Sequence, residues 1–124
     1  VRERIEEARD LGWAIGLAST SLKDWVDYHL QRVALSDHFP VRITRELVNK
    51  VKPDPEPYLK TMSELGVEAS QTVIFEDSLN GVTAAKAAGA TCIVVPNSVT
   101  AILDFPAADK RVNSLQDVRL ADLV

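Results

Sequence analysis

The sequence has few of the residues that build covalent or thiolate frameworks. Cys92 is the only cysteine in 124 residues, which excludes an internal disulfide and a cluster of thiolate ligands. It lies in the apolar run TCIVV, so we expect a buried structural thiol rather than a reactive one. No stretch approaches the roughly 20 apolar residues that a membrane-spanning helix needs, and we expect no signal peptide. A reducing cytoplasm is the compartment that these features predict.

The chain carries a small excess of acidic residues. The formal net charge is −4, and hydrophobic and charged residues make up 46% and 26% of the sequence. That composition is typical of one ordinary globular domain. An acidic balance gives no reason to expect nucleic acid or an anionic membrane as a partner.

One stretch carries most of the information, and it reads as a strand, a helix and a second strand. Val73–Phe75 is a short apolar run, Leu79–Ala88 is a helix of small residues, and Thr91–Val95 is again apolar. Such a unit has parallel strands joined by a right-handed crossover. The acids Glu76 and Asp77 follow the first strand, at the end of the sheet where α/β proteins bind ligands. Two adjacent carboxylates there favour a bound divalent cation such as Mg²⁺.

The rest of the chain alternates in the same way, which predicts a parallel, doubly wound sheet. In the helix that begins near Leu22 the apolar stripe includes Trp25, and we expect His29 on that stripe to be a packed core residue. The helix that follows Pro55 is expected to bury Tyr58, Leu59, Met62 and Leu65 and to end at Gly66. We expect the remaining elements at Val1–Leu11 (helix), Trp13–Ala18 (strand), Leu22–Val33 (helix), Val41–Thr44 (strand), Thr100–Leu103 (short helix), Arg111–Val112 (strand) and Leu115–Val124 (helical turn).

Polar groups follow three of these elements and are candidates for a single site. They are Ser19 and Thr20, then Lys52, then Glu76 and Asp77. Each alone has an ordinary explanation, because serines often cap turns, lysines are mostly solvated, and acids favour helix N-termini. Together they would supply hydroxyl and backbone donors, one fixed cation and a metal site, which is what a phosphoryl group with a divalent ion requires.

The segments LASTS, KPDPEPY and VIFEDSLNGVTAAKAAGA resemble motifs two, three and four of the haloacid dehalogenase superfamily. The resemblance is to the branch that contains β-phosphoglucomutase and the small phosphosugar phosphatases, and it covers nearly the whole chain. It implies that Ser19, with Thr20, binds the transferring phosphoryl group and that Lys52 neutralises it. It also implies that Glu76 and Asp77 hold Mg²⁺, and that the substrate is a small phosphorylated molecule.

The first motif of that family, an Asp-x-Asp on the first strand, has no match here. It supplies the nucleophilic aspartate, and neither Asp54 nor Asp104 stands in a position to replace it. We therefore expect residues 1–124 to form a single partial core domain, a three-layer Rossmann-like parallel sheet without the first strand and the helical cap. Such a chain should be inactive alone. The strands at Trp13–Ala18 and Val73–Phe75 should each have an unpaired edge, which another segment or chain could complete.

Several alternatives remain open at this point. Leu22 stands where the mutases carry a lysine, which favours a phosphatase over a mutase, although Lys23 is adjacent. A fragment of a β-phosphoglucomutase-like isomerase and a catalytically inactive module that binds phosphate, Mg²⁺ or a partner are the other possibilities. A receiver-type signalling domain would have its acids first and its lysine last, the reverse of the order here. No P-loop motif is present.

Overall fold

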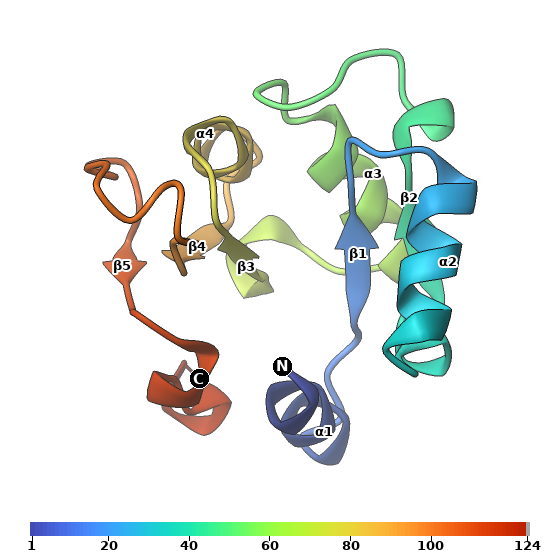
Figure 1. Cartoon of the computed structure of the whole chain (residues 1–124), viewed down its shortest axis with the longest axis horizontal. Coiled ribbons are helices and arrows are strands. Elements are labelled where there is room, and N and C mark those ends of the chain that lie inside the picture. Colours follow the sequence, from blue (N-terminus) through green and yellow to red (C-terminus); the bar gives the residue numbers. More distant parts are fainter. Residues whose placement is uncertain (124) are drawn as a thin grey trace.

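The computed structural model describes residues 1–123, which form an alternating α/β fold (Figure 1). The strands are β1 (Gly16–Ala18), β2 (Val41–Ile43), β3 (Val73–Glu76), β4 (Thr91–Val94) and β5 (Lys110–Arg111). The α-helices are α1 (Arg2–Asp10), α2 (Lys23–Arg32), α3 (Glu56–Leu65) and α4 (Leu79–Ala87). Short 3₁₀ turns lie at Ser36–His38, Arg45–Leu47, Ala69–Gln71, Leu115–Asp117 and Leu120–Leu123.

All strand pairs are parallel, but the strands fall into two separate sheets. Strand β1 pairs with β2, and β3 pairs with β4, which pairs in turn with β5. Figure 1 shows β1 and β3 facing each other across the centre of the molecule. Within the described residues neither strand has a second ladder partner, as the sequence predicted for both edges.

Helices cover both faces of this divided sheet and form the three layers of the fold. Helices α3 and α4 enclose one apolar cluster that includes Tyr58, Met62 and Val82. Helix α1 and the C-terminal turns enclose a second, and α1 and α2 a third. Helix α3 packs so closely on β1 that a Cβ at Gly16 would lie 2.7 Å from Thr61 Cγ2, which explains glycine there.

The buried faces predicted for two helices, α2 and α3, were wrong in detail. Helix α2 buries Val26 and Leu30, but Trp25 is 57% exposed, and its ring lies against that of His29 at a tilt of 40°. His29, expected in the core, is only half-buried. In α3 the side chain of Leu59 is 48% exposed, because the buried face is built around Tyr58. Apolar residues on the flank of a helical stripe can remain in solvent, and periodicity alone does not separate the flank from the centre.

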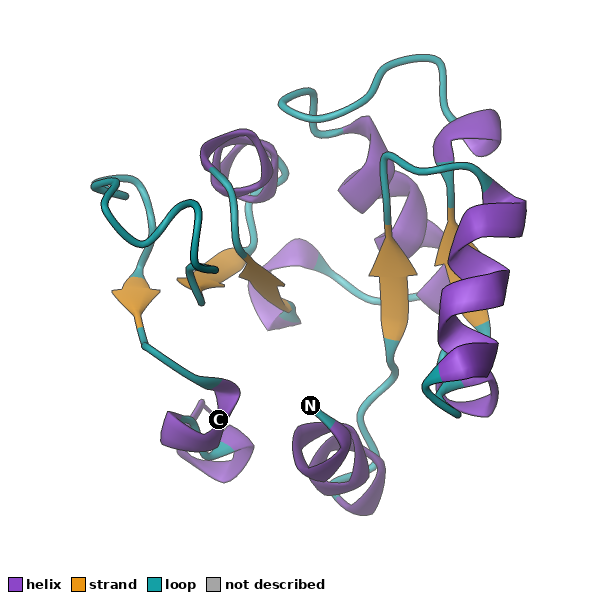
Figure 2. Ribbon diagram, viewed as in Figure 1, coloured by secondary structure: helices purple, strands orange, loops and turns teal. Residues whose placement is uncertain are grey.

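The C-terminal part also departs from the prediction. Residues 98–103 form turns rather than a helix, and Figure 2 shows this connection between β4 and β5 as loop. The last segment forms two short 3₁₀ turns instead of one helical turn, and Val124 lies outside the described residues. Gly66 ends α3 with φ of 69°, as expected for a left-handed C-terminal residue.

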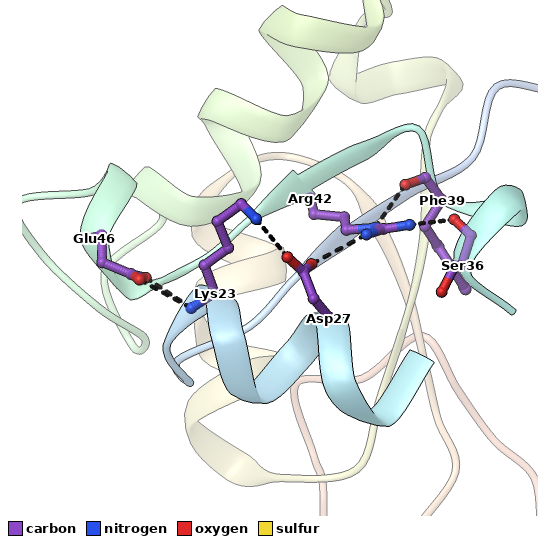
Figure 3. Close-up of polar contacts among 6 residues, drawn as sticks. All are labelled: Lys23, Asp27, Ser36, Phe39, Arg42 and Glu46. Atoms are coloured by element: carbon purple, nitrogen blue, oxygen red, sulfur yellow. Dashed lines mark hydrogen bonds and ion pairs between the residues drawn. The ribbon is translucent and has the colours of Figure 1, made fainter. Parts of the chain in front are cut away.

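A polar network on the surface attaches α2 to β2 (Figure 3). The guanidinium of Arg42 donates to Asp27 at 3.0 Å and to the carbonyl oxygen of Phe39 at 2.9 Å, and Lys23 forms an ion pair with the same carboxylate. The hydrogen bond from Lys23 holds the pKa of Asp27 below its ordinary value. The backbone N–H of Lys23 also donates to Glu46 and lowers its pKa. This network belongs to the scaffold, because its charged side chains pair with one another and with nearby backbone groups.

Among the residues that the structure describes, no helix combines the length and the apolar character needed to cross a bilayer.

Candidate functional site

A cavity of about 620 Å³ lies between the two sheets. Side chains and backbone of β1 form one wall and those of β3 form the other, and most of the lining is apolar. Charged side chains line it at the carboxyl ends of these strands, where they belong to Lys52, Glu76 and Asp77, and Arg4 of α1 also lines it. Charged side chains therefore line the cavity at the end of the sheet where parallel α/β folds bind ligands.

Lys52 connects the ends of the two sheets. Its ammonium donates to the carbonyl oxygen of Ala18, at the end of β1, at 3.1 Å and to Glu76 Oε2, at the end of β3, at 2.6 Å. The Lys52 and Glu76 side chains are only 12% and 6% exposed. The ammonium also lies 4.7 Å from the centre of the Tyr58 ring. The structure thus brings Lys52 into contact with Glu76, and the role of this lysine in binding phosphate stays a prediction.

Glu76 is the most enclosed charged group of the site. Its Oε2 accepts hydrogen bonds from Lys52 and from the Tyr58 hydroxyl. The first turn of α4 passes directly beside it, since a Cβ on Gly81 would lie 1.9 Å from Glu76 Oε1. A buried carboxylate needs this many partners, because a single unpaired charge in such a place would cost several kcal/mol.

Tyr58 is a residue of the site that the sequence analysis assigned only to the core. Its ring is buried in α3, and its hydroxyl reaches a carboxylate 18 residues further along the chain. The available signal was the rule that a buried tyrosine hydroxyl needs a partner. The sequence does not say which partner that is.

Asp77 differs from its neighbour in being exposed. Its carboxylate accepts a hydrogen bond from the side-chain amide of Asn97, and its backbone carbonyl oxygen accepts one from Thr100. Both partners come from the loop after β4 and were missed at the sequence level. Ser78 then caps α4 by accepting the N–H of Gly81 at 3.0 Å.

Ser19 and Thr20 lie just beyond the end of β1 and next to Ala18, but they do not line the cavity. The Ser19 hydroxyl oxygen accepts the backbone N–H of Ser21 at 3.0 Å, which is the ordinary turn role weighed for it above. That bond leaves the hydroxyl proton free to donate elsewhere. Thr20 is exposed.

The carboxylates present are compatible with Mg²⁺. Within residues 1–123 no group of three or more His, Cys, Asp or Glu side chains comes together as a metal cluster, so an all-protein cage is not formed. Mg²⁺ commonly needs only one or two carboxylates, with water and phosphate oxygens completing its shell. Glu76 Oε1, which lies beside Gly81, accepts from the described residues one long 3.3 Å hydrogen bond, from the N–H of Asp77, and so keeps a lone pair without a protein donor. The donor set therefore fits a hard cation.

Cys92 plays no part in this chemistry. It is fully buried in β4, and burial, with the negative charge of Glu76 as a second cause, raises its pKa to about 11. A neutral, enclosed thiol is neither a nucleophile nor a metal ligand at neutral pH, as the sequence predicted.

Comparison with known proteins agrees with this fold. The family model for haloacid dehalogenase-like hydrolases matches residues 1–95. The chain is 45% identical over its full length to YhcW of Bacillus subtilis and 36% identical to hexitol phosphatase B of Escherichia coli, covering 56% of each. The crystal structure of CbbY from Rhodobacter sphaeroides in complex with phosphate superposes with a TM-score of 0.87 at 33% identity, over 91% of this chain and 52% of that one.

The chain belongs to the haloacid dehalogenase-like hydrolase family. Its three-layer parallel α/β fold is that of the family's Rossmann-like core. The chain spans about half the length of the relatives that it matches.

Proposed function

We propose that this chain is the phosphate- and Mg²⁺-binding part of a phosphatase for small phosphorylated molecules of the phosphosugar type. The observation that carries the proposal is the bridge made by Lys52 between the ends of β1 and β3, beside the carboxylates of Glu76 and Asp77. A fixed cation next to a pair of hard oxygen ligands suits a phosphoryl group. Hexitol phosphatase B and the phosphorylated carbohydrates phosphatase of Thermotoga maritima, both relatives of this chain, support the substrate class.

The roles follow from where each group lies. Ser19 would donate its hydroxyl to a phosphoryl oxygen, with Thr20 beside it, while Lys52 would balance the charge of that group. Glu76 and Asp77 would hold Mg²⁺, directly or through water. When bound, the ion would offset the negative charge on the phosphoryl oxygens.

The nucleophile of the family's aspartyl-phosphate mechanism is not supplied by this part of the site. Among residues 1–123, only Glu76 and Asp77 line the cavity as carboxylates, and both are assigned to the metal. We therefore propose that residues 1–124 form a partial core domain and are inactive by themselves. Phosphatase rather than mutase activity is supported by Leu22, an exposed apolar residue where the mutases carry lysine.

The cavity between β1 and β3 would take the strand that carries the missing aspartate. Both strands have an unpaired edge facing it, their directions suit a parallel partner, and its apolar walls suit a strand of apolar residues. An Asp-x-Asp at the carboxyl end of that strand would reach the level of Lys52 and Asp77. The strand can come from another segment of the same protein or from a second chain.

Calorimetric binding of inorganic phosphate in the presence of Mg²⁺ tests the assigned roles. We expect Lys52→Met to lose most phosphate affinity and Asp77→Asn to lose the dependence on Mg²⁺. The matched controls are Lys50→Met and Asp104→Asn, which alter exposed residues outside the site. Wild-type phosphate affinity in Lys52→Met would remove that lysine from the site.

Turnover is tested separately with p-nitrophenyl phosphate and hexitol phosphates. We expect none from the 124-residue chain, and we expect it to appear when the chain is co-expressed with a segment bearing an apolar strand that ends in Asp-x-Asp. The matched control is the same segment with both aspartates changed to asparagine. Turnover by the chain alone would refute the proposed need for an added nucleophile.

A further inference from the structure

Asp77 is held by a loop that comes 20 residues later in the sequence. The side-chain amide of Asn97 donates to Asp77 Oδ2 at 3.1 Å, and Thr100 Oγ1 donates to the backbone carbonyl oxygen of Asp77 at 2.8 Å. Neither contact comes from β3 or α4, the elements on either side of Asp77. A separate segment therefore constrains both the side chain and the main chain of this residue.

The direction of the Asn97 amide is determined by the loop itself. Its Oδ1 accepts the backbone N–H of Val99 at 2.8 Å and that of Thr100 at 2.9 Å. With two N–H donors at the oxygen, the NH₂ group must be the end that faces the Asp77 carboxylate. The donor to Asp77 is thus built into the turn.

Thr100 also links this loop to Asp77, through hydrogen bonds of its hydroxyl group. Its Oγ1 accepts the backbone N–H of Asn97 at 3.0 Å, and its proton goes to the nearer of two acceptors, the Asp77 carbonyl oxygen at 2.8 Å rather than Asn97 Oδ1 at 3.2 Å. Asn97 is exposed and Thr100 is only half-buried, so neither side chain is enclosed in the core. The turn at residues 97–100 requires the Asn97 side-chain oxygen, but it does not require the hydrogen bonds from Asn97 and Thr100 to Asp77.

We propose that Asn97 and Thr100 are positioning residues for Asp77, which rests on the metal role proposed for Asp77 above. They hold Oδ2 and the main chain in place, and leave Oδ1 as the carboxylate oxygen to which no described residue donates. Partners that orient a metal-binding carboxylate without touching the metal commonly change its affinity by 10–100-fold. Because these two are near solvent, we expect the lower end of that range.

The test is a titration of the 124-residue chain with Mn²⁺, a spectroscopic substitute for Mg²⁺, followed by the loss of the free-ion electron paramagnetic resonance signal. Asn97→Ala and Thr100→Val should each weaken Mn²⁺ binding by about tenfold. Thr100→Ser restores the hydroxyl and should return affinity to within about twofold of wild type, which a role in side-chain packing would not predict. Ser98→Ala, an exposed position in the same loop, is the matched control and should leave affinity unchanged.

Asp77→Asn in the same titration separates this inference from the proposed function. If Asp77→Asn binds Mn²⁺ as the wild type does, Asp77 is not a metal ligand. Both its proposed metal role and the positioning role of Asn97 and Thr100 are then refuted. If Asp77→Asn loses binding while Thr100→Val and Asn97→Ala retain it, the metal role stands and the positioning role is refuted. Thermal unfolding of each variant shows whether it is folded. If Asn97→Ala does not fold, the comparison of Thr100→Val with Thr100→Ser tests the positioning role.

Discussion

Gly81 is a position where an added methyl group would collide with a hydrogen-bonded side chain of the site. In an ordinary helix Gly→Ala is stabilising, by about 1 kcal/mol in a helix interior. Here the added Cβ would lie 1.9 Å from Glu76 Oε1 and 2.0 Å from its Cδ, where contact distances of roughly 3.5 Å are normal. The carboxylate would have to retreat by about 1.5 Å, because α4 and its capped first turn are held by Ser78.

That retreat breaks the hydrogen bonds that Glu76 accepts from Lys52 and Tyr58. Hydrogen bonds to a charged group contribute about 1.5–3 kcal/mol each. After the gain in helix propensity is subtracted, we expect Gly81→Ala to lower the free energy of unfolding by about 2–5 kcal/mol. The variant should also lose Mn²⁺ binding, since one of the two proposed ligands has moved.

Urea unfolding followed by circular dichroism measures this change. Asn80→Ala is the matched control, because it alters an exposed residue of the same helical turn without meeting Glu76. We expect that control to stay within about 0.5 kcal/mol of the wild type. A Gly81→Ala protein as stable as the wild type, or more stable, would refute the assignment of Gly81 as the space for the Glu76 carboxylate.

Three further predictions concern single side chains. Tyr58→Phe should lower the free energy of unfolding by about 1–3 kcal/mol in urea titrations, because it leaves Glu76 with one donor fewer; an unchanged midpoint would contradict the contact. Cys92 has its pKa raised from 9.0 to about 11, so its contribution to stability is complete below pH 9 and is lost as the pH rises toward 11. Cys92→Ala should flatten that decline, and a decline of the same slope would assign it to other groups. Asp27 has a lowered pKa, so its contribution is present above its unfolded value of 3.8 and is lost on acidification below it. Asp27→Asn should reduce the dependence of stability on pH in that acidic range, and an unaltered acid transition would show that the ion pair with Lys23 contributes nothing.

The sequence alone determined the elements around the site and their order. Hydrophobic runs and turn residues are local signals, so β3, α4, β4 and the end of α3 at Gly66 were all predicted within a residue or two. The unpaired edges of β1 and β3 also followed from the missing first motif, and the structure confirms them for the described residues. These features depend on neighbours in the chain or on the strand order of a known family.

Only the tertiary structure decided which atoms of the site meet. Tyr58 contacts Glu76 because α3 packs against the sheet at one particular rotation, and that rotation also leaves Leu59 in solvent. Asn97 reaches Asp77 because turns rather than a helix follow β4. Such contacts join residues about 20 positions apart, and their geometry is determined by how whole elements pack, which no local pattern of residues encodes.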